Sequence, residues 1–247
     1  MRIVVIGDVH GLEAWRNVLE NAGDYDKVIF IGDYVDSHNL LNKLQYFNLK
    51  DIIEFKETYP DKVVLLLGNH DMHYINSDLQ CSGFSWNKHK LFHKLYRDNL
   101  DKFKVAHREG DFIFSHAGLS SKYLKYYGHD GESIDDAIDY VNGQLNVNIF
   151  SFDFYYGDGS WVGNHPLQGP TWIRPDALVD ANKDSWLSDY IQVFGHTQTL
   201  DSVKFAKDTN WMYICTDLLW DGKYVEIDGS DIKYADLFSS KSNTSRI

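Results

Sequence analysis

Three short apolar segments, each ending in glycine followed by polar residues, constrain the fold more than any other feature of this 247-residue chain. They are residues 3–6, 28–31 and 63–67, and each has the length of a strand. Apolar residues at helical spacing follow the first two segments, at Leu12, Trp15 and Leu19 and then at Leu49, Ile52 and Ile53. Parallel strands need helical crossovers of this kind. The pattern therefore predicts repeated strand, loop and helix units.

The second part of the chain indicates further strands and one long helix. Residues 104–107 and 112–115 flank Glu109-Gly110-Asp111, which is typical of a hairpin, and strands are expected at residues 191–194, 212–216 and 224–227. A turn at Asp221-Gly222 is expected to join the last two. Ser133, with Asp136 three residues later, favours a helix start. We expect an α/β fold in which two packed sheets form a sandwich flanked by helices.

Composition places the chain among ordinary globular proteins, with 43% hydrophobic and 24% charged residues. Without a repeat or a proline-rich linker, the prediction is one domain over residues 1–238 and a polar tail over 239–247. The apolar segments are too short to span a membrane, and residues 1–11 lack a signal-peptide pattern. These features predict a soluble cytoplasmic protein, without indicating its oligomeric state.

Charge and cysteine content exclude some classes of partner and site. A formal net charge of −12 disfavours extended nucleic-acid binding, which needs clustered basic residues. A nucleotide or another phosphorylated ligand remains allowed, because bound divalent cations add local positive charge. Cys81 and Cys215 have no CxxC spacing, so neither a disulfide framework nor a structural zinc site is expected. We interpret them as small buried apolar residues.

Polar residues recur where the predicted strands end. The loops are Gly7-Asp8-Val9-His10-Gly11, Gly32-Asp33-Tyr34-Val35-Asp36, Gly68-Asn69-His70-Asp71 and Gly195-His196-Thr197, and His116 follows the second strand of the hairpin. Parallel strands bring their carboxyl ends to one edge of a sheet, so these side chains should meet there. Carboxylate and imidazole ligands suit manganese, iron and zinc. One Gly-Asp pair is commonly just a turn, but four matched loops favour a metal site.

In these motifs the chain resembles the calcineurin-like metallophosphoesterase superfamily, and more narrowly its phosphoprotein phosphatase branch. Gly-Asp-x-His-Gly, Gly-Asp-x-Val-Asp, Gly-Asn-His-Asp, His-x-Gly and Gly-His-Thr follow the family's order between residues 7 and 197. The resemblance implies a β-sandwich between helices in four layers. It also implies two divalent metal ions, with manganese expected first and iron, zinc or nickel as alternatives.

The resemblance further implies a role for each matching residue. One metal would take Asp8, His10 and Asp33, and the other would take Asp33, Asn69, His116 and His196. His70 would be the general acid, oriented by Asp36. Arg174 would bind the substrate phosphate, and Asn69 would bind the substrate as well as a metal. Elementary chemistry agrees, since two cations about 3.5 to 4 Å apart activate water and neutralise phosphate charge. An imidazole held by a carboxylate is suited to protonate the leaving oxygen.

The sequence departs from the family pattern after Asp36. Ser37-His38 stands where the phosphoprotein phosphatase motif has Arg-Gly, and serine cannot reproduce the bidentate contact that arginine makes with phosphate. Either Arg174 and His38 hold a phosphomonoester, or the substrate carries less terminal charge, as in a phosphodiester or a nucleotide anhydride. His38 is equally compatible with a plain polar loop residue.

Three functions follow as hypotheses. The first is a phosphomonoesterase resembling Ser/Thr protein phosphatases and acting on a phosphoprotein or a nucleotide. The second is a dinucleoside polyphosphate hydrolase or a phosphodiesterase, favoured by the aromatic and glycine-rich segment 150–175, which would cover either the site or merely the core. The third is a non-catalytic scaffold with the same fold. Asp71 is expected to support or cap a ligand loop, and His73 receives no role.

Overall fold

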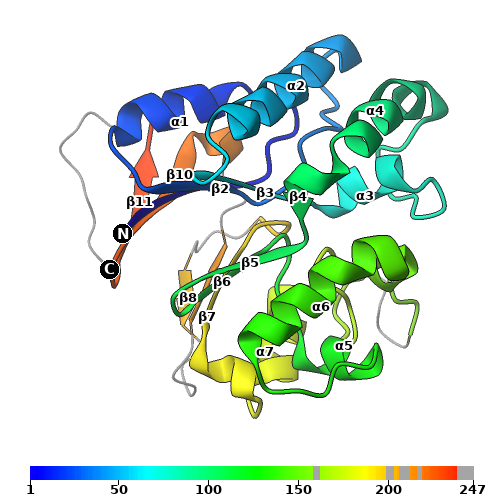
Figure 1. The fold of residues 1–247 in the computed structure, drawn as a ribbon, viewed down its shortest axis with the longest axis vertical. Coiled ribbons are helices and arrows are strands. Elements are labelled where there is room, and N and C mark those ends of the chain that lie inside the picture. Colours follow the sequence, from blue (N-terminus) through cyan, green and yellow to red (C-terminus); the bar gives the residue numbers. More distant parts are fainter. Residues whose placement is uncertain (158–161, 199–202, 206–211, 216–218, 238–247) are drawn as a thin grey trace.

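The computed structural model describes residues 1–157, 162–198, 203–205, 212–215 and 219–237, so the predicted polar tail lies outside the described residues. Two β-sheets lie one above the other, and helices cover their outer faces (Figure 1). The strand order is β11-β10-β1-β2-β3-β4 in the first sheet and β5-β6-β7-β9-β8 in the second. The predicted sandwich between helices is confirmed.

The strands and helices have the following bounds. The first sheet contains β1 (Arg2–Ile6), β2 (Lys27–Phe30), β3 (Val63–Leu66), β4 (Phe103–Lys104), β10 (Lys223–Asp228) and β11 (Asp231–Asp236). The second contains β5 (Ala106–Glu109), β6 (Phe112–Ser115), β7 (Ile191–Phe194), β8 (Val203–Phe205) and β9 (Met212–Cys215). The α-helices are α1 (Ala14–Ala22), α2 (Asn42–Thr58), α3 (Asn69–Ile75), α4 (Trp86–Asp98), α5 (Ser121–Tyr126), α6 (Ile134–Val147) and α7 (Pro175–Asn182).

The central strands of the first sheet are buried on both faces. Side chains alternate along a strand, so Ile3 and Val5 of β1 pack against the second sheet with Phe114. Val4 and Ile6 point the other way, into the layer formed with α1 and α2. Burial on both faces explains why these strands read as continuous apolar runs instead of alternating ones.

Three of the predicted helices are confirmed. Trp15 is buried on α1, as are Leu49, Ile52 and Ile53 on α2. Helix α6 starts at the predicted cap, where Ser133 Oγ accepts a hydrogen bond from the backbone N of Asp136 at 3.3 Å. The chemistry-bearing helix α3 was not predicted. It begins inside the Gly-Asn-His-Asp motif, whose polar residues carry no apolar periodicity.

Sheet membership differs from the prediction at two places. The hairpin is confirmed, but its first strand begins at Ala106, because Lys104 belongs to β4 and pairs with Leu66 in the first sheet. The expected turn at Asp221-Gly222 is present, with the backbone N of Gly222 donating to the carbonyl of Leu219 at 2.9 Å, but the strands on its two sides are not hairpin partners. Strand β9 lies in the second sheet, whereas β10 pairs with β1 in the first. Local alternation of apolar residues indicates a strand without identifying its partner.

The topology brings the predicted ligand loops together. Strands β1, β2 and β3 are parallel neighbours in the first sheet, and β6 and β7 are parallel neighbours in the second. The loops that follow the strands of one parallel set therefore start at the same edge of their sheet. None of the helices in the described part of the chain has the length and apolar composition that a membrane crossing requires.

Candidate metal centre and catalytic site

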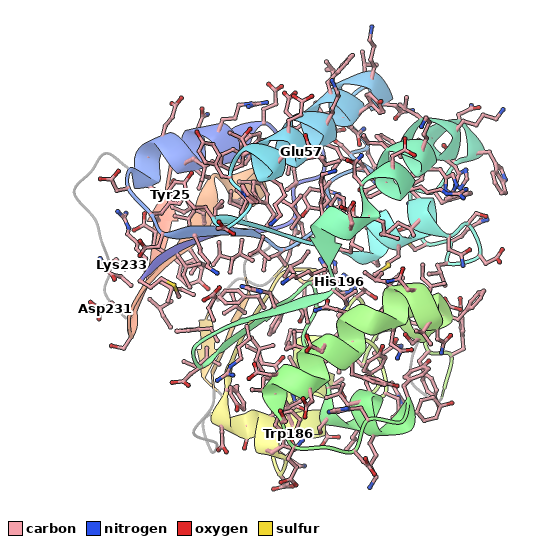
Figure 2. The ribbon with its side chains drawn as sticks, in the orientation of Figure 1. Tyr25, Glu57, Trp186, His196, Asp231 and Lys233 are labelled. Atoms are coloured by element: carbon pink, nitrogen blue, oxygen red, sulfur yellow. The ribbon has the colours of Figure 1, made fainter. Side chains whose placement is uncertain are left out.

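The six predicted metal ligands all lie just after the five parallel strands. Asp8 and His10 follow β1, Asp33 follows β2, and Asn69 is the first residue of α3 after β3. The second sheet supplies His116 after β6 and His196 after β7. Figure 2 shows His196 between the two halves of the molecule. The site is therefore built by both sheets.

Four site residues other than glycine have a left-handed backbone. The φ angles are 43° at His10, 49° at Asp33, 72° at Asp36 and 62° at His196, and these are the non-glycine residues with positive φ in the described chain. Such conformations are uncommon and cluster at functional sites, where the surrounding structure maintains them. The surrounding structure therefore maintains an uncommon backbone at three of the predicted ligands and at Asp36.

Asp71 ties two of the ligand loops together. Its buried carboxylate accepts hydrogen bonds from the backbone N of Gly68 at 2.7 Å, Asp33 at 2.8 Å and Tyr34 at 3.0 Å, and from the hydroxyl of Tyr96. The loops after β2 and β3 therefore share one acceptor group. The expectation that Asp71 supports a ligand loop is confirmed.

Two glycines allow ligand carboxylates to approach the backbone closely. A Cβ at Gly68 would lie 2.1 Å from Asp33 Oδ1, and one at Gly195 would lie 2.2 Å from Asp8 Oδ1. No side chain fits at those separations. The glycines in these motifs are therefore required by the position of the neighbouring carboxylates as well as by the turn itself.

Asp8, His10 and Asp33 form the first candidate ligand group. The Nδ1 of His10 donates a hydrogen bond to the carbonyl of Val35 at 2.8 Å. The neutral ring therefore carries its lone pair on Nε2, which lies 3.9 Å from Asp33 Oδ2. Burial and the neighbouring His70 lower the pKa of His10 to about 4, so the ring is neutral at physiological pH and ready to bind a cation.

The second candidate group consists of Asn69, Asp33, His116 and His196. His116 Nε2 lies 3.0 Å from Asn69 Oδ1, 3.2 Å from His196 Nδ1 and 3.4 Å from Asp33 Oδ2. Ligands of a metal with bonds of about 2.0 to 2.2 Å stand about 2.8 to 3.6 Å apart at tetrahedral or octahedral angles. The three separations from His116 Nε2 are thus those expected between ligands of one ion.

The protonation pattern of this group also fits a cation. His116 Nδ1 donates to the carbonyl of Ile31 at 3.2 Å, so Nε2 of the neutral ring presents a lone pair to the acceptor oxygens around it. Burial lowers the pKa of His116 to about 3, which keeps the ring neutral. Burial, His116 and Arg174 likewise lower the pKa of His196. Facing lone pairs repel one another unless a cation lies between them.

Asp33 joins the two ligand groups through one oxygen. Its Oδ2 faces His10 Nε2 of the first group and His116 Nε2 of the second, while Oδ1 accepts a hydrogen bond from the backbone N of His70 at 2.9 Å. Two sets of side chains that could each hold a metal ion share this carboxylate. The ligands predicted from the sequence therefore lie together as two adjacent groups. The backbone N of His70 is hydrogen-bonded to the carboxylate that the groups share.

His70 and Asp36 form the predicted pair beside the ligands. His70 Nδ1 lies 3.0 Å from Asp36 Oδ2 in a hydrogen bond, and the rings of His70 and His10 meet edge to face at 5.3 Å. Burial alone would raise the pKa of Asp36, but hydrogen bonds from His70, His73, Lys88 and Tyr74 outweigh it and hold the pKa well below its usual range. Asp36 is therefore a carboxylate throughout the physiological range.

Sequence reasoning missed three partners of Asp36. His73 Nε2 lies 2.8 Å from Oδ2, the Tyr74 hydroxyl donates to Oδ1 at 2.6 Å, and Lys88 Nζ donates to Oδ1 at 2.8 Å. A sequence signal existed for His73, which follows His70 by three residues and so shares its face of α3. Lys88 is 52 residues away from Asp36 along the chain. No local pattern relates them.

Cys81 is not simply a small apolar residue. Its Sγ lies 3.1 Å from His73 Nδ1, and burial, with the Asp33 charge, raises the pKa of the Cys81 thiol. The protonated thiol is therefore the donor in this contact. His73 is fixed between Cys81 and Asp36, close to the predicted ligand Asn69, whose Nδ2 lies 3.6 Å from the same sulfur. The side chain of Cys215 lies outside the described residues.

Arg174 and the aromatic segment also reach the site. Arg174 Nη1 donates to the carbonyl of His196 at 3.0 Å and to Thr197 Oγ1 at 2.9 Å. The Trp172 ring meets the His196 ring edge to face at 5.7 Å. His38, in contrast, is exposed. It lies near enough to His10 to have a small electrostatic effect, which lowers the pKa of the His10 ring. The described part of segment 150–175 therefore contacts the site itself.

Comparison with known sequences extends these observations. The family described as calcineurin-like phosphoesterase matches residues 1–223. A putative serine/threonine-protein phosphatase of Schizosaccharomyces pombe is 29% identical over 191 residues, which is 72% of this chain and 51% of that protein. The catalytic subunit of serine/threonine-protein phosphatase 4 from Candida glabrata is 33% identical over 76 residues, or 30% of this chain and 23% of that one. The chain thus spans at most about half the length of these relatives.

Solved structures share the fold. The cold-active protein-tyrosine phosphatase of a Shewanella species superimposes with a TM-score of 0.64 at 16% identity, covering 99% of this chain and 80% of that one. A protein serine/threonine phosphatase from Saccharomyces cerevisiae superimposes with a TM-score of 0.55 at 16% identity, covering 99% and 82%. At these identities the likeness establishes the architecture. Because the family match covers most of the sequence, the chain belongs to the calcineurin-like phosphoesterase family.

Proposed function

We propose that this protein hydrolyses phosphomonoesters with the help of two divalent metal ions, manganese being the expected pair and iron, zinc or nickel the alternatives. The observation that carries the proposal is the shared carboxylate. One oxygen of Asp33 faces both ligand groups, and the His70–Asp36 pair lies directly beside them. With Asp33, Asp8 and His10 would be the ligands of the first ion. Asn69, His116 and His196, again with Asp33, would be the ligands of the second.

Bound cations at these ligands would lower the pKa of a water molecule and neutralise the charge of the phosphate. The chain itself supplies the remaining chemistry. His70, oriented through Nδ1 by Asp36, donates a proton to the oxygen of the departing alcohol, which would otherwise leave as an unstable alkoxide. Arg174, held beside His196 and Thr197, orients the phosphate by charge-assisted hydrogen bonds.

A second candidate is hydrolysis of a phosphodiester or a dinucleoside polyphosphate. The arginine found after Asp36 in the phosphoprotein phosphatase motif is Ser37 here, a buried residue whose hydroxyl accepts from the backbone N of Asn39 at 3.2 Å. The aromatic segment favours a base as part of the substrate. Phe154 packs on Trp172 at 5.0 Å, and the Trp172 ring contacts His196. Aromatic faces of this kind stack on any base.

A substrate panel separates these functions. The purified protein would be assayed with Mn²⁺ on p-nitrophenyl phosphate, bis-p-nitrophenyl phosphate, a phosphoserine peptide and diadenosine tetraphosphate. We expect the monoesters to be hydrolysed fastest. Preference for the diester or for diadenosine tetraphosphate would instead establish the second candidate. A protein that binds Mn²⁺ yet hydrolyses none of the four would be a scaffold rather than an enzyme.

Variants test the roles of the named residues. His70→Asn should reduce the rate on the best substrate by about 10² to 10⁴ while metal content stays unchanged, because His70 acts on the leaving group. His89→Asn, a histidine of α4 outside the site, is the matched control and should retain the wild-type rate. His38→Ala tests the exposed loop histidine, and unchanged kinetics would show that His38 makes no contact with the substrate.

A further inference from the structure

The carboxylate of Asp36 is held from two directions, with its two oxygens serving different partners. Oδ2 faces the imidazoles of His70 at 3.0 Å and His73 at 2.8 Å. Oδ1 accepts from the Tyr74 hydroxyl at 2.6 Å and from Lys88 Nζ at 2.8 Å. The carboxylate cannot rotate without losing contacts on both sides. Its orientation is therefore set before any substrate arrives.

Lys88 is itself fixed at the start of α4. Its Nζ also donates to the carbonyl of Gly83 at 3.0 Å, and its backbone N donates to Ser85 Oγ at 3.3 Å. The side chain is only 14% exposed, which is low for lysine. Gly83 approaches so closely that a Cβ there would lie 3.0 Å from Asp36 Oδ2. The chain between α3 and α4 thus brings a buried ammonium group to the site.

The charge of Lys88 matters because the Asp36 side chain is fully buried. A buried carboxylate is unfavourable unless a cation or several donors compensate it. Tyr74 is a neutral donor, and the imidazoles of His70 and His73 are cationic only when protonated. Lys88 places an ammonium group against Oδ1, whereas His70 lies against Oδ2. Without it, the carboxylate would lose both its counterion and one of the two donors that fix Oδ1.

We propose that Lys88 is a positioning residue that holds the Asp36 carboxylate through Oδ1, so that Oδ2 orients His70 toward the leaving oxygen. The inference rests on the proposed function, and it assigns to α4 a part in the reaction that no sequence motif indicates. Lys88 acts through Asp36 and His70 and not on the phosphate. Its removal should therefore slow reactions that need a proton on the leaving group and spare those that do not.

The leaving group provides the test. Phenyl phosphate releases a basic phenolate that benefits from protonation, whereas 2,4-dinitrophenyl phosphate releases a stable anion. We expect Lys88→Met to lower kcat by about tenfold on phenyl phosphate and by less than about twofold on 2,4-dinitrophenyl phosphate, with KM unchanged for both. Lys88→Arg, which retains the charge, should restore most of the loss. Lys90→Met, an exposed lysine of the same helix, should match the wild type on both substrates.

Two further measurements separate positioning from other roles. In a His70→Asn background, Lys88→Met should cause no additional loss on either substrate, because the residues act in series. Tyr74→Phe removes the other donor to Oδ1 and should give a smaller loss with the same leaving-group dependence, which decides the question if Lys88→Met does not fold. Equal losses on both substrates, or a raised KM without leaving-group dependence, would overturn the proposal. An inactive wild type would instead refute the proposed function.

Discussion

At the scale of single residues, the site depends on side chains that hold other side chains. Asp71 is neither a proposed ligand nor the proposed acid, yet its carboxylate accepts hydrogen bonds that fix the backbone at Asp33 and Gly68. His73 and Lys88 likewise contact Asp36, the partner of His70. Ligand geometry at a metal centre depends on such supporting contacts nearly as much as on the ligands themselves.

Replacing Asp71 tests this dependence. Asp71→Asn keeps the shape of the side chain but replaces one acceptor oxygen with an amide N–H₂ group. Backbone N–H donors that now point at an acceptor would then point at another donor. Each buried donor left without an acceptor costs about 1 to 3 kcal/mol. We expect Asp71→Asn to lower the free energy of unfolding by about 2 to 4 kcal/mol and to weaken metal binding. Urea denaturation with EDTA and metal titration measure the two effects.

Asp78→Asn is the matched control, since Asp78 is exposed just beyond the end of α3. Its free energy of unfolding should change by no more than about 0.5 kcal/mol. If Asp71→Asn proved as stable as the control and bound metal equally well, the carboxylate would not be the tie between the loops after β2 and β3.

At the scale of elements, one ion pair connects the two sheets away from the site. Lys27 begins β2 in the first sheet, and its Nζ contacts Glu109 at the end of β5 in the second. His107 Nε2 lies 2.8 Å from the same carboxylate oxygen. Burial alone would raise the pKa of Glu109, but Lys27 and His107 outweigh burial and hold the pKa below its ordinary value of 4.5.

This lowered pKa gives a pH dependence with a definite sign. A carboxyl group whose pKa is depressed in the folded state stabilises the fold fully above its unfolded pKa of about 4.5 and loses that contribution as the pH falls through the folded value. We expect Glu109→Gln to unfold more readily than the wild type at pH 7, with the difference shrinking below pH about 4.5. Thermal unfolding of both proteins, at pH 7 and at pH values below about 4.5, measures this difference in stability.

The exposed pair Lys50–Glu54 provides the comparison. Both side chains are about half exposed, so Glu54→Gln should have little effect at any pH, as is usual for surface ion pairs. A Glu109→Gln variant whose stability paralleled the wild type at every pH would show that the contact between the sheets contributes nothing to folding.

At the scale of the whole molecule, the proposed metals would connect the two sheets. Asp8, His10, Asp33 and Asn69 follow strands of the first sheet, whereas His116 and His196 follow strands of the second. The second proposed ion, which would take Asp33 and Asn69 from the first set and His116 and His196 from the second, would favour the closed sandwich over any state in which the sheets separate. Unfolding would require their release, so metal affinity adds to stability.

Metal binding should therefore raise the unfolding temperature. At a free concentration about 100 times the dissociation constant, an ion that binds only the folded state adds about 2.7 kcal/mol, or roughly 5 to 10 °C for a chain of this size. Scanning calorimetry with Mn²⁺ and with EDTA measures the shift. Asp33→Asn, which weakens the shared ligand of both groups, should lose most of it. Equal shifts in wild type and variant would place the ion elsewhere.

The sequence by itself determined the ligand loops and the architecture. Strand-length apolar runs followed by Gly-Asp or Gly-Asn indicate a turn at a sheet edge, because local sterics and burial dictate both features. Helix α6 was equally readable, since its cap at Ser133 and its buried face are encoded within 13 residues, Ser133 to Leu145. These predictions required only neighbours in sequence.

Only the tertiary structure decided which distant residues meet outside the motif loops. Three contacts join segments that are far apart along the chain. They are the pairing of β10 with β1, the ion pair between Lys27 and Glu109, and the ion pair between Lys88 and Asp36. In the sequence, these contacts correspond only to lysines, glutamates and alternating apolar residues. Such residues also occur on any protein surface and in any strand. Packing of the whole chain selects these partners, because the burial of a charge or a sheet edge is settled only when every layer is in place.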